Sequence, residues 1–212
     1  FGKMTALSSD TTPLLCGIAG GIGSGKSIFS RLLRMRGYKV FDCDYEAKLL
    51  MQSDAQIRAS IEKEFGGVHV LGNKEFARKV FHNPEMLLKL NAIVHPAVKL
   101  RLIEWAEEPS ERNIKFVESA ILASSGIAEQ CDAVCRIITP HEQCIRNVVC
   151  RSQLNRQEIF SRIEAQAEET ALLEDLKVDC YPIYNNSERS LLQQADTLIE
   201  ILESYNQHLP KC

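Results

Sequence analysis

The sequence has no long hydrophobic run and no excess of charge of either sign. Its longest apolar stretch, around 14–22, is short and interrupted by glycines, so no segment is predicted to span a bilayer. Its 212 residues include 25 Lys and Arg against 28 Asp and Glu, which gives a net charge of −3. This balance argues against a general nucleic-acid or acidic-membrane binder. We therefore expect no nucleic acid and no membrane among its partners.

The eight cysteines lack the spacing of a metal site. None forms a Cys-x-x-Cys pair, and no set of Cys and His has zinc-finger spacing. Most lie within apolar runs, where a reduced thiol behaves as a small hydrophobic group. Residues 1–12 contain no apolar core followed by small residues, so we expect no secretory signal there. These features together predict a cytoplasmic protein.

Short β-like runs alternate with longer helical patterns along the chain. Buried strands are predicted at Leu14–Ala19, Lys39–Asp42, Ile114–Ser119, Ala133–Thr139 and about Cys180–Tyr184. Alternation of strands and helices implies right-handed crossovers and a mainly parallel sheet that is covered on both faces. The predicted fold class is therefore α/β, with a five-stranded parallel sheet as the middle of three layers.

One long stretch, 45–113, interrupts this alternation because no strand in it is convincing. Its pattern predicts several helices, which include Ala55–Phe65, Lys74–Phe81, Pro84–Val94 and Pro96–Glu107. Ser53, with Gln56 three residues on, is the predicted cap of one helix, and Asn83 before Pro84 is that of another. A helical insertion of this kind is suited to be an arm that holds a second substrate.

A second stretch, 141–175, is helical and rich in arginine. The arginines are Arg146, Arg151, Arg156 and Arg162. A cationic helical excursion is typical of a lid that closes over phosphate groups. A solvated surface hairpin is the alternative interpretation.

The segment Gly20–Ser27 matches the phosphate-loop motif G-x-x-x-x-G-K-[ST] at every position. Its glycines let the backbone curl N–H groups around an anion, and the following helix adds the positive end of its dipole. Lys26 would contact the β- and γ-phosphates, and the Ser27 hydroxyl would ligate Mg²⁺. An apolar strand before the loop and an apolar helical stripe after it disfavour a chance glycine-rich turn. The motif therefore predicts nucleoside triphosphate binding by Gly21, Ile22, Gly23, Ser24, Gly25, Lys26, Ser27 and Ile28.

Two carboxylates follow the second predicted strand, at Asp42 and Asp44. The carboxyl ends of strands face the ligand crevice in an open parallel sheet, and in an extended segment these two side chains would point to the same side. One carboxylate could accept a proton from an attacking hydroxyl while the other organises Mg²⁺. The alternative is that Asp44 only caps a helix that begins with Tyr45.

The ordered set of motifs resembles the dephospho-CoA kinase family, which catalyses the last step of coenzyme A synthesis. The resemblance is carried by the phosphate loop, by Asp42-x-Asp44 with Ala47-Lys48, and by later motifs as far as about Leu202. The later motifs are Phe65-Gly66, Val80-Phe81, His95-Pro96, Glu142-Gln143 with Arg146, Arg162-Ile163 with Gln166, and Asn185-Asn186.

The resemblance implies ATP-dependent phosphorylation of the ribose 3′-hydroxyl of dephospho-CoA, with Mg²⁺ as cofactor, giving CoA and ADP. Asp44 matches the catalytic base of the family, and lid arginines would meet the transferring phosphoryl group. The implied nucleotide-binding core is 14–44, 114–140 and 176–207, flanked by the arm and the lid. The implied assembly is a monomer or a small homo-oligomer. Another P-loop small-molecule kinase is the first alternative, and a nucleotide-binding regulator is the second.

Some positions depart from the family pattern. The family usually has Pro-Leu-Leu-Phe-Glu after the third strand, and its glutamate is Ser124 here. Lys48 replaces a usual arginine, which keeps the charge but loses bidentate geometry. Cys150 occupies the place of the second lid arginine, so that role is assigned to the next residue, Arg151, alongside Arg146.

Three further residues have two interpretations each. Glu118 on the third strand could serve Mg²⁺ or substrate, or it could be a buried structural carboxylate. His95, before a proline, could contact the substrate, or it could simply end one helix and cap the next. Asn185 at the end of the last strand could contact adenine, or it could only form a turn.

Overall fold

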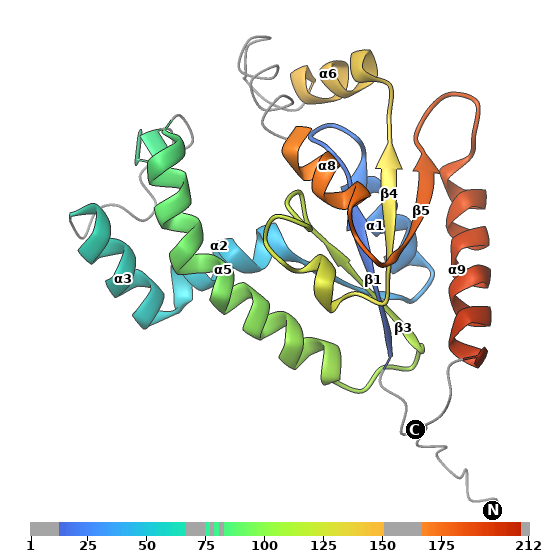
Figure 1. Cartoon of the computed structure of the whole chain (residues 1–212), viewed down its shortest axis with the longest axis horizontal. Coiled ribbons are helices and arrows are strands. Elements are labelled where there is room, and N and C mark those ends of the chain that lie inside the picture. The colour runs from blue at the N-terminus through green and yellow to red at the C-terminus, as the bar shows by residue number, and fades with distance from the viewer. Residues whose placement is uncertain (1–12, 67–74, 77–78, 81–82, 151–166, 209–212) are drawn as a thin grey trace, which may run out of the picture.

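A five-stranded parallel sheet organises the fold (Figure 1). The computed structural model describes residues 13–66, 75–76, 79–80, 83–150 and 167–208. The strands are β1 (Leu14–Ala19), β2 (Lys39–Asp42), β3 (Ile114–Glu118), β4 (Ala133–Ile138) and β5 (Asp179–Tyr184). They lie in the order β2-β3-β1-β4-β5, and every pairing is parallel. The predicted α/β class and five-stranded parallel sheet are confirmed, with strand ends that agree to within one residue.

Helices cover both faces of the sheet because its central strands are apolar on both sides. The described helices are α1 (Lys26–Met35), α2 (Cys43–Ser53), α3 (Ala55–Phe65), α5 (Pro84–Glu107), the short 3₁₀ helix η1 (Ala128–Gln130), α6 (His141–Val149), α8 (Ala167–Glu174) and α9 (Leu191–His208). Alternate residues of β1 enter two separate cores: Cys16 packs with residues of α1 and α9, and Leu15 with residues of α2 and α5. None of these helices is long and apolar enough to cross a membrane.

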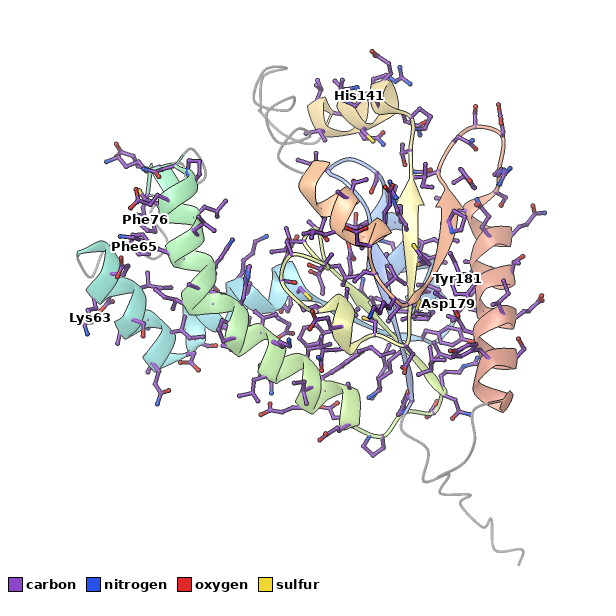
Figure 2. All side chains as sticks on the ribbon, in the orientation of Figure 1. Lys63, Phe65, Phe76, His141, Asp179 and Tyr181 are labelled. Atoms are coloured by element: carbon purple, nitrogen blue, oxygen red, sulfur yellow. The ribbon has the colours of Figure 1, made fainter. Side chains whose placement is uncertain are left out.

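Helices α2, α3 and α5 extend away from the edge of the sheet (Figure 1). Ile57 and Ile61 of α3 are buried in the same core as Val94 and Val98 of α5, which holds these helices together. Near the end of this extension, Phe65 packs edge to face against Phe76, with ring centroids 5.3 Å apart (Figure 2). The extension is therefore a folded part of the molecule with its own apolar contacts.

The prediction of two helices separated at Pro96 is wrong, because α5 runs without a break through that residue. A proline inside a helix removes one backbone hydrogen bond and costs about 3 kcal/mol. Val94, Val98 and Leu102 form a buried stripe that continues across the proline. Burial of that stripe offsets the cost, so His95 lies in mid-helix and neither ends nor caps one.

The cap of α3 also differs from the prediction. Ser53 is the last residue of α2, and its hydroxyl donates to the Leu49 carbonyl. Asp54 caps α3 instead, because its carboxylate accepts from the backbone N–H groups of Gln56 and Ile57. Asn83 caps α5 as predicted.

A fully buried lysine fastens the end of α5 to the sheet. Lys115 of β3 donates through Nζ to the carbonyl oxygens of Trp105 at 2.6 Å, Ala106 at 3.0 Å and Glu108 at 2.5 Å. The last carbonyl groups of a helix lack partners within it and carry partial negative charge, so an ammonium group satisfies them well. The Trp105 ring lies against Phe41 of β2, with centroids 5.3 Å apart. These contacts fix the base of the extension relative to the strand ends.

Candidate active site

The phosphate-loop motif forms a tight turn between β1 and α1. Gly23 and Gly25 adopt φ angles of 73° and 97°, which side-chain-bearing residues rarely do. A Cβ at Gly25 would lie 2.5 Å from Asn185 Nδ2, and one at Gly23 would collide with the Cys144 carbonyl. Both glycines are therefore required by conformation and by space.

Side chains from three other elements hold the loop carbonyl groups. Thr139 Oγ1, just after β4, and Asn185 Nδ2, just after β5, each donate to the Ser24 carbonyl at 2.7 Å. Asn147 Nδ2 of α6 donates to the Gly23 carbonyl at 2.8 Å. In a trans peptide the N–H points opposite to the C=O, so these bonds also fix the directions of the loop N–H groups. The loop is thus organised to receive an anion.

Thr139 and Asn147 were missed by the sequence analysis. Neither residue belongs to a local motif, and polar residues after a strand or on a helix usually face solvent. Asn185 was predicted to contact adenine, and the structure places its amide against the loop.

Lys26 begins α1 and folds back over the loop. Its Nζ donates to the Gly20 carbonyl at 2.6 Å and the Gly21 carbonyl at 3.1 Å. Burial lowers the pKa of the Lys26 ammonium, and the carboxylates of Glu118 and Asp44 act in the opposite direction. The carboxylates of Glu118 and Asp44 are therefore close enough to act electrostatically on the Lys26 ammonium.

The prediction of an extended segment at 42–44 is wrong. Helix α2 begins at Cys43, so Asp42 is its N-cap and accepts from the Tyr45 N–H at 3.0 Å. Asp44 lies exposed in the first turn of this helix and does not cap it. The helix begins earlier than expected because Asp42 satisfies one of its free N–H groups, that of Tyr45, directly after the strand. The two carboxylates consequently do not lie on one side of a strand.

Glu118 lies opposite Asp42 in the pairing of β2 with β3. It is 9% exposed, and its Oε2 has no hydrogen-bond partner. Burial raises the pKa of its carboxyl group, and the nearby charge of Asp42 adds to this effect. A buried carboxylate oxygen without a partner is costly and is suited to a cation or a donor from a ligand.

The residues present fit a magnesium ion held together with a nucleotide. No group of three or more His, Cys, Asp or Glu among the described residues could hold a metal alone. Mg²⁺ commonly takes only one or two protein ligands and completes its shell with water and phosphate oxygens. Ser27 lies exposed in the first turn of α1, and Glu118 offers an unpartnered oxygen.

The remaining predicted site residues lie on several elements. Ile28 is exposed on α1, and Lys48 is exposed on α2, one turn after Asp44. His95 is half-buried on α5, and burial lowers the pKa of its imidazole. Arg146 is exposed on α6, whose first residue, His141, is labelled in Figure 2. Arg151 lies outside the described residues.

A pocket of about 200 Å³ lies between the loop and α8. Its lining includes Gly21, Arg136, Cys144 and Glu169. This volume is below the roughly 300–1,000 Å³ of a typical small-molecule site, so it suits a part of a ligand only. Arg136 is held in its wall by an ion pair with Glu174 at 3.0 Å.

Glu169 is a further acid that sequence reasoning missed. Its carboxylate is buried and accepts from the backbone N–H groups of Ala123 at 2.6 Å and Ser124 at 2.9 Å. The side chain therefore joins α8 to the turn that follows β3. The composition of 141–175 is marked by its arginines, and no local sequence pattern distinguishes this buried acid from exposed carboxylates.

Comparisons with known sequences agree with one another. A family model described as dephospho-CoA kinase matches residues 14–189. A dephospho-CoA kinase of Bacteroides fragilis is 32% identical over 192 residues, which cover 88% of this chain and 91% of that protein. Another, of Thermus thermophilus, is 34% identical over 158 residues, which cover 74% of this chain and 77% of that protein.

Solved structures share the fold. A crystal structure from Thermus thermophilus has a TM-score of 0.73 and 29% identity, covering 95% of this chain and 100% of that one. A dephospho-CoA kinase from Campylobacter jejuni has a TM-score of 0.63 and 24% identity, covering 91% and 98% respectively. A shikimate kinase from Bacteroides thetaiotaomicron has a TM-score of 0.53 and 14% identity, covering 90% and 98%. The last two likenesses show the fold alone.

Proposed function

The chain belongs to the dephospho-CoA kinase family and is an ATP-dependent kinase of dephospho-CoA, and we propose that its loop and strand-end acids carry out transfer to the ribose 3′-hydroxyl. The observation that carries this proposal is a phosphate loop that is held by three side-chain hydrogen bonds. Beside it, the charges of Glu118 and Asp44 act on the Lys26 ammonium. Phosphoryl transfer requires positioning and charge neutralisation more than covalent chemistry, and this arrangement supplies both.

ATP is proposed to bind with its triphosphate in the loop. The loop N–H groups would surround the phosphates, and Lys26 would leave the Gly20 and Gly21 carbonyls to contact the β- and γ-phosphate oxygens. Asn185 would contribute by holding the loop from the end of β5. The proposed nucleotide-binding residues are seven of the motif and the residue after it, which are Gly21, Ile22, Gly23, Ser24, Gly25, Lys26, Ser27 and Ile28.

Asp44 is proposed as the general base that accepts the proton of the 3′-hydroxyl. It is exposed in the first turn of α2, and its charge acts on the Lys26 ammonium, so a hydroxyl bound beside it would lie near the terminal phosphate. Asp42, Lys48, His95 and Glu118 are proposed to contact the substrate. The 45–113 segment, with α2, α3 and α5, would be the arm that holds the rest of dephospho-CoA.

The 141–175 segment is proposed to act as the lid. Arg146 on α6 and Arg151 would contact the transferring phosphoryl group, where guanidinium groups neutralise the charge that spreads over its oxygens. Helix α6 lies next to the loop in the structure, which supports this role for Arg146.

Mg²⁺ is proposed to be held by the Ser27 hydroxyl, with Glu118 nearby. When bound, the ion would neutralise charge on the phosphate oxygens.

The seven described cysteines are free thiols, which supports the proposed cytoplasmic location.

An acceptor panel tests this function. ADP formation from ATP is measured with dephospho-CoA, with nucleosides and nucleotides, and without an acceptor. We expect rapid turnover of ATP only when dephospho-CoA is the acceptor. Turnover of a nucleoside instead would favour another P-loop kinase, and slow hydrolysis that no acceptor accelerates would favour a nucleotide-binding regulator.

A further inference from the structure

Helix α6 rests directly on the phosphate-binding loop, and this contact is separate from both main cores. Ile145 and Val148 of α6 are buried together, with Ile22 of the loop packed against them. At Gly23 the loop backbone approaches α6 so closely that no side chain fits between it and the Cys144 carbonyl. Loop and helix therefore pack as one unit at this point.

A hydrogen bond from Asn147 crosses this packing. Its Nδ2 donates to the Gly23 carbonyl at 2.8 Å, and the residue is half-buried. Apolar packing is non-directional and tolerates small rotations of a helix, whereas a hydrogen bond requires a narrow range of angles. The amide thus fixes the rotation of α6 relative to the loop.

Arg146 precedes Asn147 and is exposed. Successive residues are about 100° apart around a helix, so holding Asn147 on the loop also fixes the direction in which Arg146 leaves α6. Guanidinium contacts with phosphoryl oxygens depend strongly on this direction.

We propose that Asn147 is a positioning residue for phosphoryl transfer, acting by fixing α6 and Arg146 relative to the nucleotide loop. The catalytic part of this inference rests on the proposed function, because it uses the role assigned to Arg146. The seating of α6 on the loop does not depend on that role.

A double-mutant cycle with Arg146 tests the catalytic part. Asn147→Leu keeps most of the side-chain volume but cannot donate, and we expect it to lower kcat about tenfold while KM for dephospho-CoA stays unchanged. In an Arg146→Ala background the same change should have less than about a twofold further effect. Val149→Ala, at an exposed position of the same helix, is the matched control and should leave kcat unchanged.

Hydrogen exchange tests the seating itself. In Asn147→Leu we expect amides of 144–149 to exchange several-fold faster than in the wild type and in Val149→Ala. Exchange of these amides at the wild-type rate in Asn147→Leu would overturn the inference that Asn147 holds α6 on the loop. Independent, additive effects on kcat would overturn its action through Arg146. A wild-type rate for Arg146→Ala alone would instead refute the role proposed for that arginine, and the exchange result would still decide the role of Asn147.

Discussion

Replacing Lys115 by methionine is expected to destabilise the protein substantially. The change keeps the stem length and removes the ammonium group that donates to three carbonyl groups at the end of α5. A hydrogen bond to a charged group contributes about 1.5–3 kcal/mol, so the gross loss is roughly 5–9 kcal/mol. Removing a buried ammonium recovers several kcal/mol of desolvation. The expected net loss is about 2–4 kcal/mol.

Thermal unfolding measures this loss. For a chain of this size 1 kcal/mol corresponds to about 2–4 °C, so Tm should fall by about 5–15 °C. Trp105 is the sole tryptophan and lies 4.9 Å from the Lys115 ammonium, so its fluorescence reports the same contact. The control is Lys39→Met, because exposed Lys39 also donates to a carbonyl, that of Pro109. A Tm for Lys115→Met equal to that of the control would refute the anchoring role.

Three further substitutions test the site. Glu118→Gln should raise Tm at pH 7 yet impair Mg²⁺-dependent activity. Burial raises the pKa of Glu118 in the folded state above its value in the unfolded chain. The ionised carboxylate therefore lowers the stability of the fold at pH values above the folded-state pKa, and it has no such effect at pH values below the unfolded-state pKa. The gain in Tm should therefore vanish in acid, and a gain that persists there would contradict this cause. Asp44→Asn should slow transfer by roughly 100-fold while ATP binding, followed by calorimetry, stays intact; lost Mg²⁺ affinity with a small rate effect would indicate metal organisation instead. Lys26→Ala should weaken ATP binding in the same calorimetric assay, and unchanged affinity would contradict contact with the phosphates.

The sheet and the loop could be predicted because their signals are local. A buried parallel strand such as Leu14–Ala19 is a continuous apolar run, and the phosphate loop needs glycines at positions that a motif specifies. Both depend on a few consecutive residues, so the sequence alone is sufficient to identify them.

The errors arose where tertiary contacts or a single cap decide the conformation. Pro96 is a strong local signal for a break, yet a buried stripe on both sides of it keeps α5 continuous. Asp42 is both the last residue of β2 and the N-cap of α2, and its side-chain contact with the Tyr45 N–H starts the helix directly after the strand. Periodicity does not contain either piece of information.

The residues that hold the loop and the neighbouring turn in place could not be predicted from the sequence for another reason. Asn147 and Glu169 contact backbone groups more than 40 positions away in the chain, as their partners Gly23 and Ala123 show. No spacing rule connects such pairs, because only the folded sheet brings α6 and α8 to the loop and to the turn after β3.

Transfer of labelled phosphate shows directly whether the chain phosphorylates the ribose 3′-hydroxyl of dephospho-CoA. The protein is incubated with ATP labelled in its γ-phosphate and with dephospho-CoA, and the product is identified by its label and its site of phosphorylation. We expect label on the ribose 3′-oxygen with the wild-type chain, and almost none with Lys26→Ala. Label that appears only as free phosphate, or on another hydroxyl group, would contradict the proposed function.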